Sequence, residues 1–342
     1  MIKILTIVIA AYNKEDLLPR CLDSLIISPE QMEKVQILIV NDGSKDKTLE
    51  IAQQYQKKYP LYFIAIDKEN GNYGSVMNKA ILLAEGKYFR TLDADDWYDK
   101  DAYSAFIADL EKTDADMIIS QRLMYDANTK EYSLKPLPDN IEKYSDLNPT
   151  DIDWNNPLIH SNLNVPHITF KTSIIRESGL KWIEKICYTD TMYDFWPLRL
   201  VKKVRFVPLN VYVYLTGDEE QSMSPQNLSK NFSHFQQVAQ ALINNFNEHK
   251  DESNPMYSVQ LKFLWQIMSF IYPFLFRDSK YDQHVLYLHK QYIKIPEIAE
   301  ITNNMSFHGV HYLHTSHAGS LPVTFKILRF ISRTKNRLFN LT

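Results

Sequence analysis

The chain has 342 residues, 45% of them hydrophobic and 23% charged, with a formal net charge of −3. This composition is typical of a globular protein long enough for about two domains, and it lacks the basic excess of most nucleic-acid-binding proteins, so we expect no nucleic-acid partner. Two cysteines, Cys21 and Cys187, are too few for a disulfide framework, which favours a reducing compartment.

Neither apolar stretch of the sequence has the features of a membrane span. The N-terminal run holds only about eight apolar residues, the lower limit for a signal peptide, and a buried strand explains it better. Residues 263–276 fall short of the roughly 20 apolar residues that cross a bilayer, and they include Gln266 and Pro273. We therefore expect no transmembrane segment.

Residues 1–120 alternate between strand-like and helix-like segments. Apolar runs, many of them β-branched, predict buried strands at 2–10, 35–40, 61–66, 87–92 and 115–120. Apolar residues at helical spacing predict helices at 14–27, 46–59, 75–84 and 101–110. This alternation predicts an α/β fold with a mostly parallel sheet and flanking helices.

The remainder of the chain has a less regular pattern. Prolines and asparagines between 126 and 166 suggest loops packed onto the first part. Helix-like and strand-like segments return between 168 and 215, and from Gln226 onward the pattern is helical. We therefore expect a helical C-terminal region.

Polar loops follow four of the predicted strands, at 10–15, 41–46, 68–74 and 93–97. Right-handed crossovers bring the C-terminal ends of parallel strands to one edge of a sheet, where such sheets bind ligands. The sequence therefore predicts a ligand cleft at this edge.

The last of these loops is acidic, with Asp93, Asp95, Asp96 and Asp99 close together. Counted from Asp93, an EF-hand calcium loop would need glycine at the sixth position and glutamate at the twelfth, and the chain has tyrosine and serine there. Alternate residues of an extended segment project the same way, so Asp93 and Asp95 can converge on one divalent cation. A solvated acidic turn is the alternative, and we expect Asp99 to cap the next helix.

Two other loops carry weaker signals. Asp42 can accept hydrogen bonds from a base N–H or a ribose hydroxyl, and Gly43 permits a tight turn, although a plain strand-to-helix turn has the same pattern. Gly71 and Gly74 lie beside the start of a helix, whose free N–H groups can face a phosphate. The glycines can equally serve the turn alone.

The first 110 residues closely resemble the family 2 glycosyltransferases with a GT-A (Rossmann-like) nucleotide-sugar-binding fold, through IVIAAYNKEDLLPRCLDSL, ILIVNDGSKDKTLEIA and NGNYGSVMNKAILLAEGKYFRTLDADDW. The resemblance continues more loosely to about Ser224, through HITFKTSIIRESGL, YTDTMYDFWPL and VYVYLTGDEEQSMS, segments similar to a bacterial subgroup that assembles cell-surface polysaccharides. We therefore expect a nucleotide-sugar-binding half at 1–120, an acceptor-binding and catalytic half at 121–225, and a C-terminal helical region at 226–342.

The resemblance implies a donor site built from the polar loops. Tyr12 and the adjoining backbone of Ala10 and Ala11 would flank the base, and Asp42 would bind uracil or ribose. Further donor-binding residues would be Gly74, Asn78, Asp93, Ala94 and Asp95.

The resemblance also implies a different role for each acidic residue. Asp93 would lie beside the donor sugar or ribose and help to hold the metal, and Asp95 would hold Mg²⁺ or Mn²⁺ against the diphosphate. Asp190 aligns with the family's catalytic base, with Thr189 in place of the glutamate that usually precedes it. His167 would lie near the acceptor or the metal, with a hydrogen-bonded structural histidine as an equal alternative.

The activity implied is an inverting, metal-dependent transfer of one sugar from a UDP-sugar to a glycan or lipid-linked acceptor. The Q-x-x-R-W signature of processive synthases is absent, which favours transfer of a single sugar. Many relatives have arginine where this chain has Met77, and arginine where Leu215 and Thr216 stand, so the diphosphate charge would depend more on the metal. A nucleotidyltransferase and a degenerate nucleotide-sugar-binding scaffold are the alternatives.

The C-terminal tail has a separate signal. Residues 321–342 are basic without an acidic residue, and as a helix they would separate a basic side from an apolar side. That pattern suits contact with an anionic membrane, which implies a cytoplasmic protein peripheral to the inner face of the cell membrane, although a core-packed helix is the alternative. His308, His311, His314 and His317 recur every third residue, and we expect no metal site there because helical geometry spreads them around the axis.

Overall fold

The computed structural model describes residues 3–217, 225–272, 274 and 279–299. The chain divides into two compact units, Met1–Lys230 and Asn231–Thr342. The basic tail at 321–342 and the histidines at 308–317 lie outside the described residues, so the expectations for them stay predictions.

The first unit is built on a mixed sheet with the strand order β3-β2-β1-β4-β9-β6-β10-β5, while β7 pairs with β6 and β8 with β10. Its strands are β1 (Leu5–Ala11), β2 (Val35–Asp42), β3 (Phe63–Lys68), β4 (Tyr88–Asp93), β5 (Trp97–Tyr98), β6 (Met117–Asp126), β7 (Tyr132–Lys135), β8 (Asp146–Leu147), β9 (Ile168–Lys171) and β10 (Val204–Thr216). The pairs among β1 to β4 and the long β6–β10 pair are parallel, whereas β9 enters antiparallel between β4 and β6. The predicted α/β fold with a mostly parallel sheet is confirmed.

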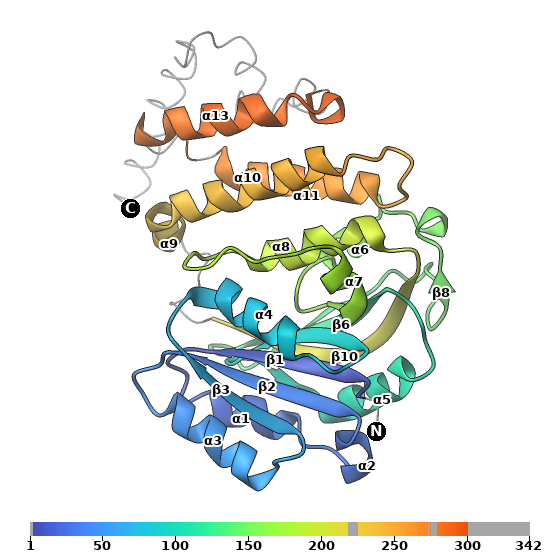
Figure 1. Cartoon of the computed structure of the whole chain (residues 1–342). Coiled ribbons are helices and arrows are strands. Elements are labelled where there is room, and N and C mark those ends of the chain that lie inside the picture. The colour runs from blue at the N-terminus through green and yellow to red at the C-terminus, as the bar shows by residue number, and fades with distance from the viewer. Residues whose placement is uncertain (1–2, 218–224, 273, 275–278, 300–342) are drawn as a thin grey trace. The chain divides into compact units, whose positions relative to one another are not determined.

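Helices flank both faces of this sheet, with α1 and α3 on one side and α4 and α8 on the other (Figure 1). The helices of the unit are α1 (Leu18–Ser24), α2 (Pro29–Met32), α3 (Thr48–Lys58), α4 (Asn72–Leu83), α5 (Lys100–Leu110), α6 (Pro157–Ser161), α7 (Thr172–Glu177), α8 (Asp190–Phe195) and α9 (Pro225–Lys230), with 3₁₀ turns η1 (Pro149–Asp151) and η2 (Trp196–Leu200).

Strand register brings the polar loops together. Ala11 is paired with Asn41, and Ala10 with Asp93, so β1, β2 and β4 end side by side. Because these strands are parallel, the loops that follow them leave the sheet at one edge. The edge predicted to form a ligand cleft is therefore a real feature of the fold.

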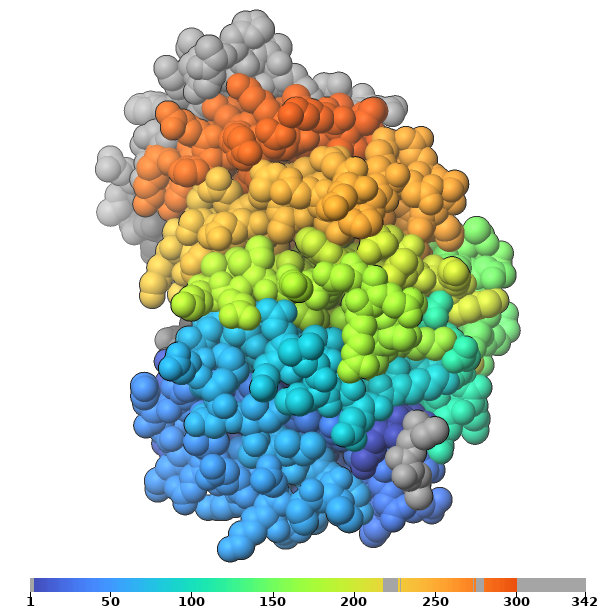
Figure 2. Space-filling model, viewed as in Figure 1, coloured from blue at the N-terminus to red at the C-terminus, as the bar shows by residue number. Residues whose placement is uncertain are grey.

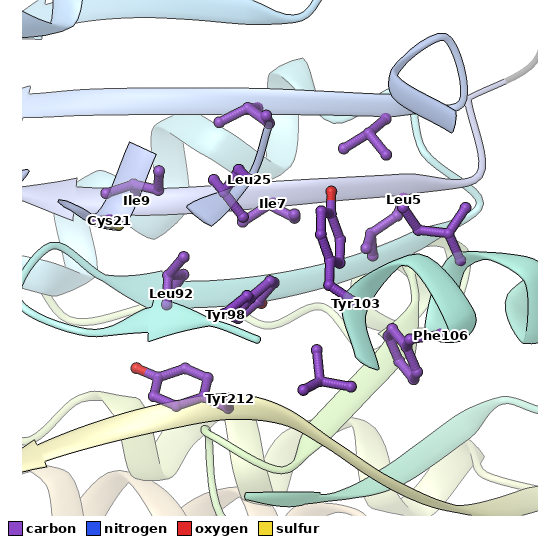
Figure 3. Packing of buried hydrophobic residues seen from close by; sticks show 14 of the residues in the cluster. Leu5, Ile7, Ile9, Cys21, Leu25, Leu92, Tyr98, Tyr103, Phe106 and Tyr212 are labelled. Atoms are coloured by element: carbon purple, nitrogen blue, oxygen red, sulfur yellow. The ribbon is translucent and has the colours of Figure 1, made fainter. Parts of the chain in front are cut away.

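A buried apolar cluster fixes the strands beneath this edge. Ile7 and Ile9 of β1 pack with Cys21 and Leu25 of the α1 region and with Tyr98 near the acidic loop (Figure 3). Fully burying a side chain of this size contributes about 1.5–3 kcal/mol, so the ends of β1 and β4 have little freedom to move.

Several elements differ from the sequence-based expectations. Residues 14–17 form turns and α1 begins at Leu18, with Pro19 in its first turn, where proline is tolerated. Two short strands, β7 and β8, lie within the region expected to be loops. Asp99 caps α5 as predicted, since its carboxylate accepts a hydrogen bond from the Ala102 N–H at 2.9 Å.

The described part of the second unit is helical, as expected. It contains α10 (Phe232–Glu248), α11 (Tyr257–Ile271), η3 (Ser279–Tyr281) and α13 (Asp282–Tyr292). Within the described residues, no helix combines the length and the apolar character needed to cross a membrane.

Candidate active site

A cavity of about 260 Å³ lies where β1, β2 and β4 end and α4 begins. It is lined by Ala10, Ala11, Tyr12, Lys14, Asp42, Asn72, Tyr73, Val76, Asp93, Ala94 and Asp95. The structure thus brings together the predicted donor-site residues that follow β1, β2 and β4.

Asp42 anchors one side of the cavity. Its side chain is almost fully buried, and Oδ1 accepts hydrogen bonds from Lys68 Nζ at 2.7 Å and from the Gly71 N–H at 2.9 Å. These bonds tie the end of β2 to the turn before α4. Tyr12 lies on the same cavity with 47% of its surface exposed, so its ring is available to a planar ligand.

Three carboxylates lie close together at the end of β4, and two of them, Asp93 and Asp95, line the other side of the cavity. Ligand oxygens of Asp93, Asp95 and Asp96 all lie within 4.8 Å of one another. Burial, followed by the charges of Asp95 and Asp190, raises the pKa of Asp93 to about 7. Asp95 is relieved in part by Lys14, whose Nζ lies 2.8 Å from its Oδ2.

Asp96 has a different environment from its two neighbours. Its side chain is buried, accepting hydrogen bonds from the Tyr212 hydroxyl at 2.5 Å and from the Leu215 N–H at 2.7 Å. Burial, followed by the charge of Asp93, raises its pKa well above the usual range. These contacts join the acidic loop to β10, so Asp96 serves the fold of the site.

The donor set fits a hard divalent cation. Asp93 and Asp95 line the cavity and offer carboxylate oxygens, the ligands that Mg²⁺ and Mn²⁺ prefer. One or two carboxylates suffice for Mg²⁺, which keeps its other positions for water and phosphate oxygens. Asp95 and Asp93 are therefore the residues that would hold the metal.

Asp190 stands at the start of α8, after a segment with two residues in left-handed backbone conformation, Lys185 (φ 64°) and Tyr188 (φ 67°). Its side chain is accessible to solvent, and desolvation by the surrounding protein raises its pKa above the usual aspartate range. After burial, its charge is one of the contributions that raise the pKa of Asp93 and of Tyr73, and both of these residues line the cavity.

Gly74 and Asn78 lie outside the cavity lining, on the side of α4 that contacts the segment before Asp190. A Cβ on Gly74 would come within 2.1 Å of the Ile183 carbonyl oxygen. Asn78 Oδ1 accepts from the Trp182 N–H, and Asn78 Nδ2 donates to the Trp182 carbonyl oxygen and to Glu184 Oε1, each at 2.9 Å. In Figure 2 the blue-to-cyan surface of α4 touches the yellow-green surface of the segment before Asp190.

The N-terminal turn of α4 holds the same segment, because the Lys185 N–H donates to the Gly71 carbonyl oxygen at 2.7 Å. In this arrangement Gly74 and Asn78 contact the protein, and their predicted donor contacts stay predictions. At this position Gly74 and Asn78 hold the segment that leads to Asp190.

His167 is fully buried and does not line the cavity. Its Nδ1 lies 2.7 Å from the Ser120 carbonyl oxygen, and burial, with the charge of Arg122, lowers the pKa of the ring to about 3. A buried neutral ring of this kind favours the structural alternative over the catalytic one.

Four cavity residues were missed by the sequence analysis: Lys14, Asn72, Tyr73 and Val76. Lys14 belongs to the first polar loop, and its charge opposite an acidic loop was a signal that could have been used. Asn72 and Tyr73 belong to the third loop, where the glycines drew attention instead.

The family model described as "Glycosyl transferase family 2" matches residues 6–176, half of the chain. The chain belongs to this family. An uncharacterized glycosyltransferase of Mycoplasma pneumoniae is 38% identical over 133 residues, which are 38% of this chain and 43% of the relative. The poly(ribitol-phosphate) beta-glucosyltransferase of Bacillus spizizenii is 28% identical over 222 residues, 64% of this chain and 33% of the relative. The alignments thus cover less than half of either relative.

Solved structures of the same fold extend the likeness along the chain. Staphylococcus aureus TarS 1–349 in complex with UDP-GlcNAc has a TM-score of 0.69 and 15% identity, over 97% of this chain and 92% of TarS 1–349. A Pyrobaculum calidifontis mannosyltransferase in complex with GDP-Man and Mn²⁺ has a TM-score of 0.50 and 14% identity, over 97% and 86% of the two chains. At these identities the likeness establishes the fold, which is the GT-A fold expected from the sequence.

The contacts of Asn78 generate a testable prediction. Asn78→Ala removes all three hydrogen bonds to the 182–184 segment and leaves main-chain groups of Trp182 without partners, which costs about 1–3 kcal/mol for each buried group. We expect urea denaturation to show a loss of about 2 kcal/mol in the free energy of unfolding.

Lys79→Ala, on the exposed side of the same helix, is the matched control and should change stability by less than about 0.5 kcal/mol. Equal stability of the two variants would show that the Asn78 contacts do not hold the segment.

Proposed function

We propose that this protein is an inverting, metal-dependent glycosyltransferase that moves one sugar from a UDP-sugar to a glycan or lipid-linked acceptor. The observation that carries the proposal is a single cavity with Tyr12 and Asp42 on one side and Asp93 and Asp95 on the other, beside Asp190. Membership of glycosyl transferase family 2 supports the reaction class. The TarS complex contains UDP-GlcNAc, and the B. spizizenii relative is named as a poly(ribitol-phosphate) beta-glucosyltransferase, which supports a UDP-sugar as donor and a polymer as acceptor.

Each side of the cavity would bind one part of the donor. The Tyr12 ring and Asp42 would hold the nucleoside, since an aromatic face stacks on a base and a carboxylate accepts from hydroxyl and N–H groups. Because Met77 stands where many relatives have arginine, the diphosphate charge was expected to depend more on the metal. Lys14 would add a positive charge near the diphosphate. A bound Mg²⁺ or Mn²⁺ would neutralise the charge that develops on the departing diphosphate.

Asp190 would act as the general base. Its carboxylate accepts the proton of an acceptor hydroxyl as that oxygen forms the new bond to the anomeric carbon. The bond from the anomeric carbon to the diphosphate oxygen breaks in the same step, and UDP leaves with the electron pair. One displacement of this kind inverts the anomeric centre.

In this scheme the halves of the first unit have separate tasks. Among the described residues, the cavity lining comes from residues 1–120, which would bind the donor, and residues 121–225 would bind the acceptor and supply the base. A degenerate binding scaffold would keep the donor site but would not turn over. A nucleotidyltransferase would release diphosphate instead of UDP, which identifies it by product analysis.

Asp190→Asn tests the base. The amide has the shape of the carboxylate but cannot take up the proton, so we expect UDP binding to stay within about twofold while the rate of sugar transfer falls about 10²–10⁴-fold. Calorimetric titration with UDP and chromatographic detection of product measure the two quantities. Asp101→Asn, an exposed carboxylate on α5, is the matched control. A normal transfer rate in Asp190→Asn contradicts the assignment.

Asp95→Asn tests the metal site. Lys14 keeps its charge in this variant and attracts phosphate by itself, so the informative quantity is the gain in UDP affinity on adding Mg²⁺. We expect wild type to bind UDP at least about tenfold more tightly with Mg²⁺ than with EDTA, and the variant to lose that gain. Equal UDP affinity of the wild type in Mg²⁺ and in EDTA would rule out metal-assisted donor binding.

We also propose that residues 321–342 attach the protein to the inner face of the cell membrane, where a lipid-linked acceptor would be found. The support is the basic, acid-free composition of this tail. Deleting residues 321–342 should abolish co-sedimentation with vesicles containing anionic lipid. Undiminished co-sedimentation of the truncated protein would refute this attachment.

A further inference from the structure

The hydroxyl of Tyr73 is a buried polar group whose role the proposed mechanism leaves open. Tyr73 lines the cavity, and its hydroxyl oxygen is shielded from solvent without a hydrogen-bond partner among the described residues. The hydroxyl of Thr91 is its neighbour and is likewise buried and without a partner in the described part of the chain. A bond between these two hydroxyls would use one proton and leave the other without an acceptor.

The main chain that leads into Tyr73 is held in place. Asn72, the first residue of α4, has a left-handed backbone (φ 60°). The preceding Gly71 is held by its N–H to Asp42 and by its carbonyl oxygen to the Lys185 N–H. These contacts hold the main chain from which the Tyr73 side chain reaches the cavity.

A buried hydroxyl without a partner is unfavourable, and a ligand that accepts a hydrogen bond from it removes that cost. Thr91 and Asp93 are two residues apart on β4, so their side chains lie on the same face of the strand. Thr91, the neighbour of the Tyr73 hydroxyl, thus lies on the face of β4 that carries Asp93, the residue expected beside the donor sugar.

Burial, followed by the charge of Asp93, raises the pKa of the Tyr73 phenol well above its usual range. The group therefore stays protonated and can act as a hydrogen-bond donor. Among the chemical groups expected in the cavity, the hydroxyl and carbonyl oxygens of a sugar are acceptors that suit a neutral donor of this kind.

We propose that Tyr73 donates a hydrogen bond to the sugar ring of the donor, with Thr91 donating to the Tyr73 oxygen, and that this contact selects the sugar. The inference rests on the proposed function and deepens it by naming a residue that distinguishes one UDP-sugar from another. A site built to bond a particular sugar oxygen discriminates against a sugar that lacks it, because the protein group is then left unpaired.

Tyr73→Phe removes the oxygen and keeps the ring, so it isolates the proposed bond. The probes are UDP and a panel of UDP-GlcNAc, UDP-GalNAc, UDP-glucose and UDP-galactose, titrated calorimetrically with Mg²⁺ present. We expect the UDP-sugar that wild type prefers to bind about tenfold more weakly to the variant, with UDP affinity unchanged and the preference within the panel reduced. Thr91→Val should also weaken binding of the preferred UDP-sugar relative to UDP, by a smaller factor.

Tyr103→Phe is the matched control, because Tyr103 also has a buried hydroxyl without a partner among the described residues but packs in the core away from the cavity. It should leave every affinity unchanged and should not lower the unfolding midpoint, since Tyr103→Phe removes a hydroxyl without a partner among the described residues. Thermal unfolding of the three proteins measures this directly.

Two negative results would have different consequences, one for the Tyr73 assignment and one for the proposed function. If wild type binds UDP and a UDP-sugar, and Tyr73→Phe has the same ratio of UDP-sugar affinity to UDP affinity as wild type, the Tyr73 assignment is wrong and the proposed function stands. If wild type binds neither UDP nor any sugar of the panel, the proposed function itself is refuted, and the assignment of Tyr73 falls with it.

Discussion

Repulsion among carboxylates at the end of β4 is the constraint on which the arrangement of the site depends. Three acidic side chains have oxygens within 4.8 Å of one another, and burial, followed by the charges of Asp95 and Asp190, raises the pKa of Asp93. The chain relieves part of this strain with Lys14 at Asp95 and with the Tyr212 hydroxyl at Asp96. A divalent cation bound to Asp93 and Asp95 would relieve the rest, because its charge is the largest in such a site.

The rest of the fold keeps these carboxylates beside the proposed nucleoside-binding residues and the segment that carries Asp190. Parallel pairing of β1, β2 and β4 sets the nucleoside side of the cavity beside the carboxylates. The first turn of α4 then connects three parts of the site: it is bound to Asp42, it presents Tyr73, and it holds the segment that leads to Asp190. The N-terminal end of α4 thus connects the donor-binding side of the cavity to the segment that carries Asp190, the proposed base. Gly74 and Asn78 contact that segment, which explains why they face protein and not the cavity.

The sequence was sufficient for the alternating first half of the fold, because strands buried on both faces leave continuous apolar runs that are easy to recognise. It also located Asp42, Asp93 and Asp95 on one edge, since parallel topology determines where strands end. It was insufficient where long-range contacts decide the outcome: β8 forms by pairing with the distant strand β10, and Asp96 is set apart by Tyr212 and the Leu215 N–H. The burial of His167 and the inclusion of Tyr73 in the cavity likewise depend on tertiary packing, which no local pattern encodes.

The central claim is that the carboxylates at the end of β4 hold a metal ion against the diphosphate of a nucleotide sugar. Crystals grown with Mn²⁺ and UDP, measured at a wavelength where manganese scatters anomalously, test it most directly. The account predicts an anomalous peak about 2 Å from a carboxylate oxygen of Asp95 that also contacts the diphosphate, with the base between Tyr12 and Asp42. UDP bound in this cavity without a manganese peak at Asp95 or Asp93, or bound elsewhere on the protein, would contradict it.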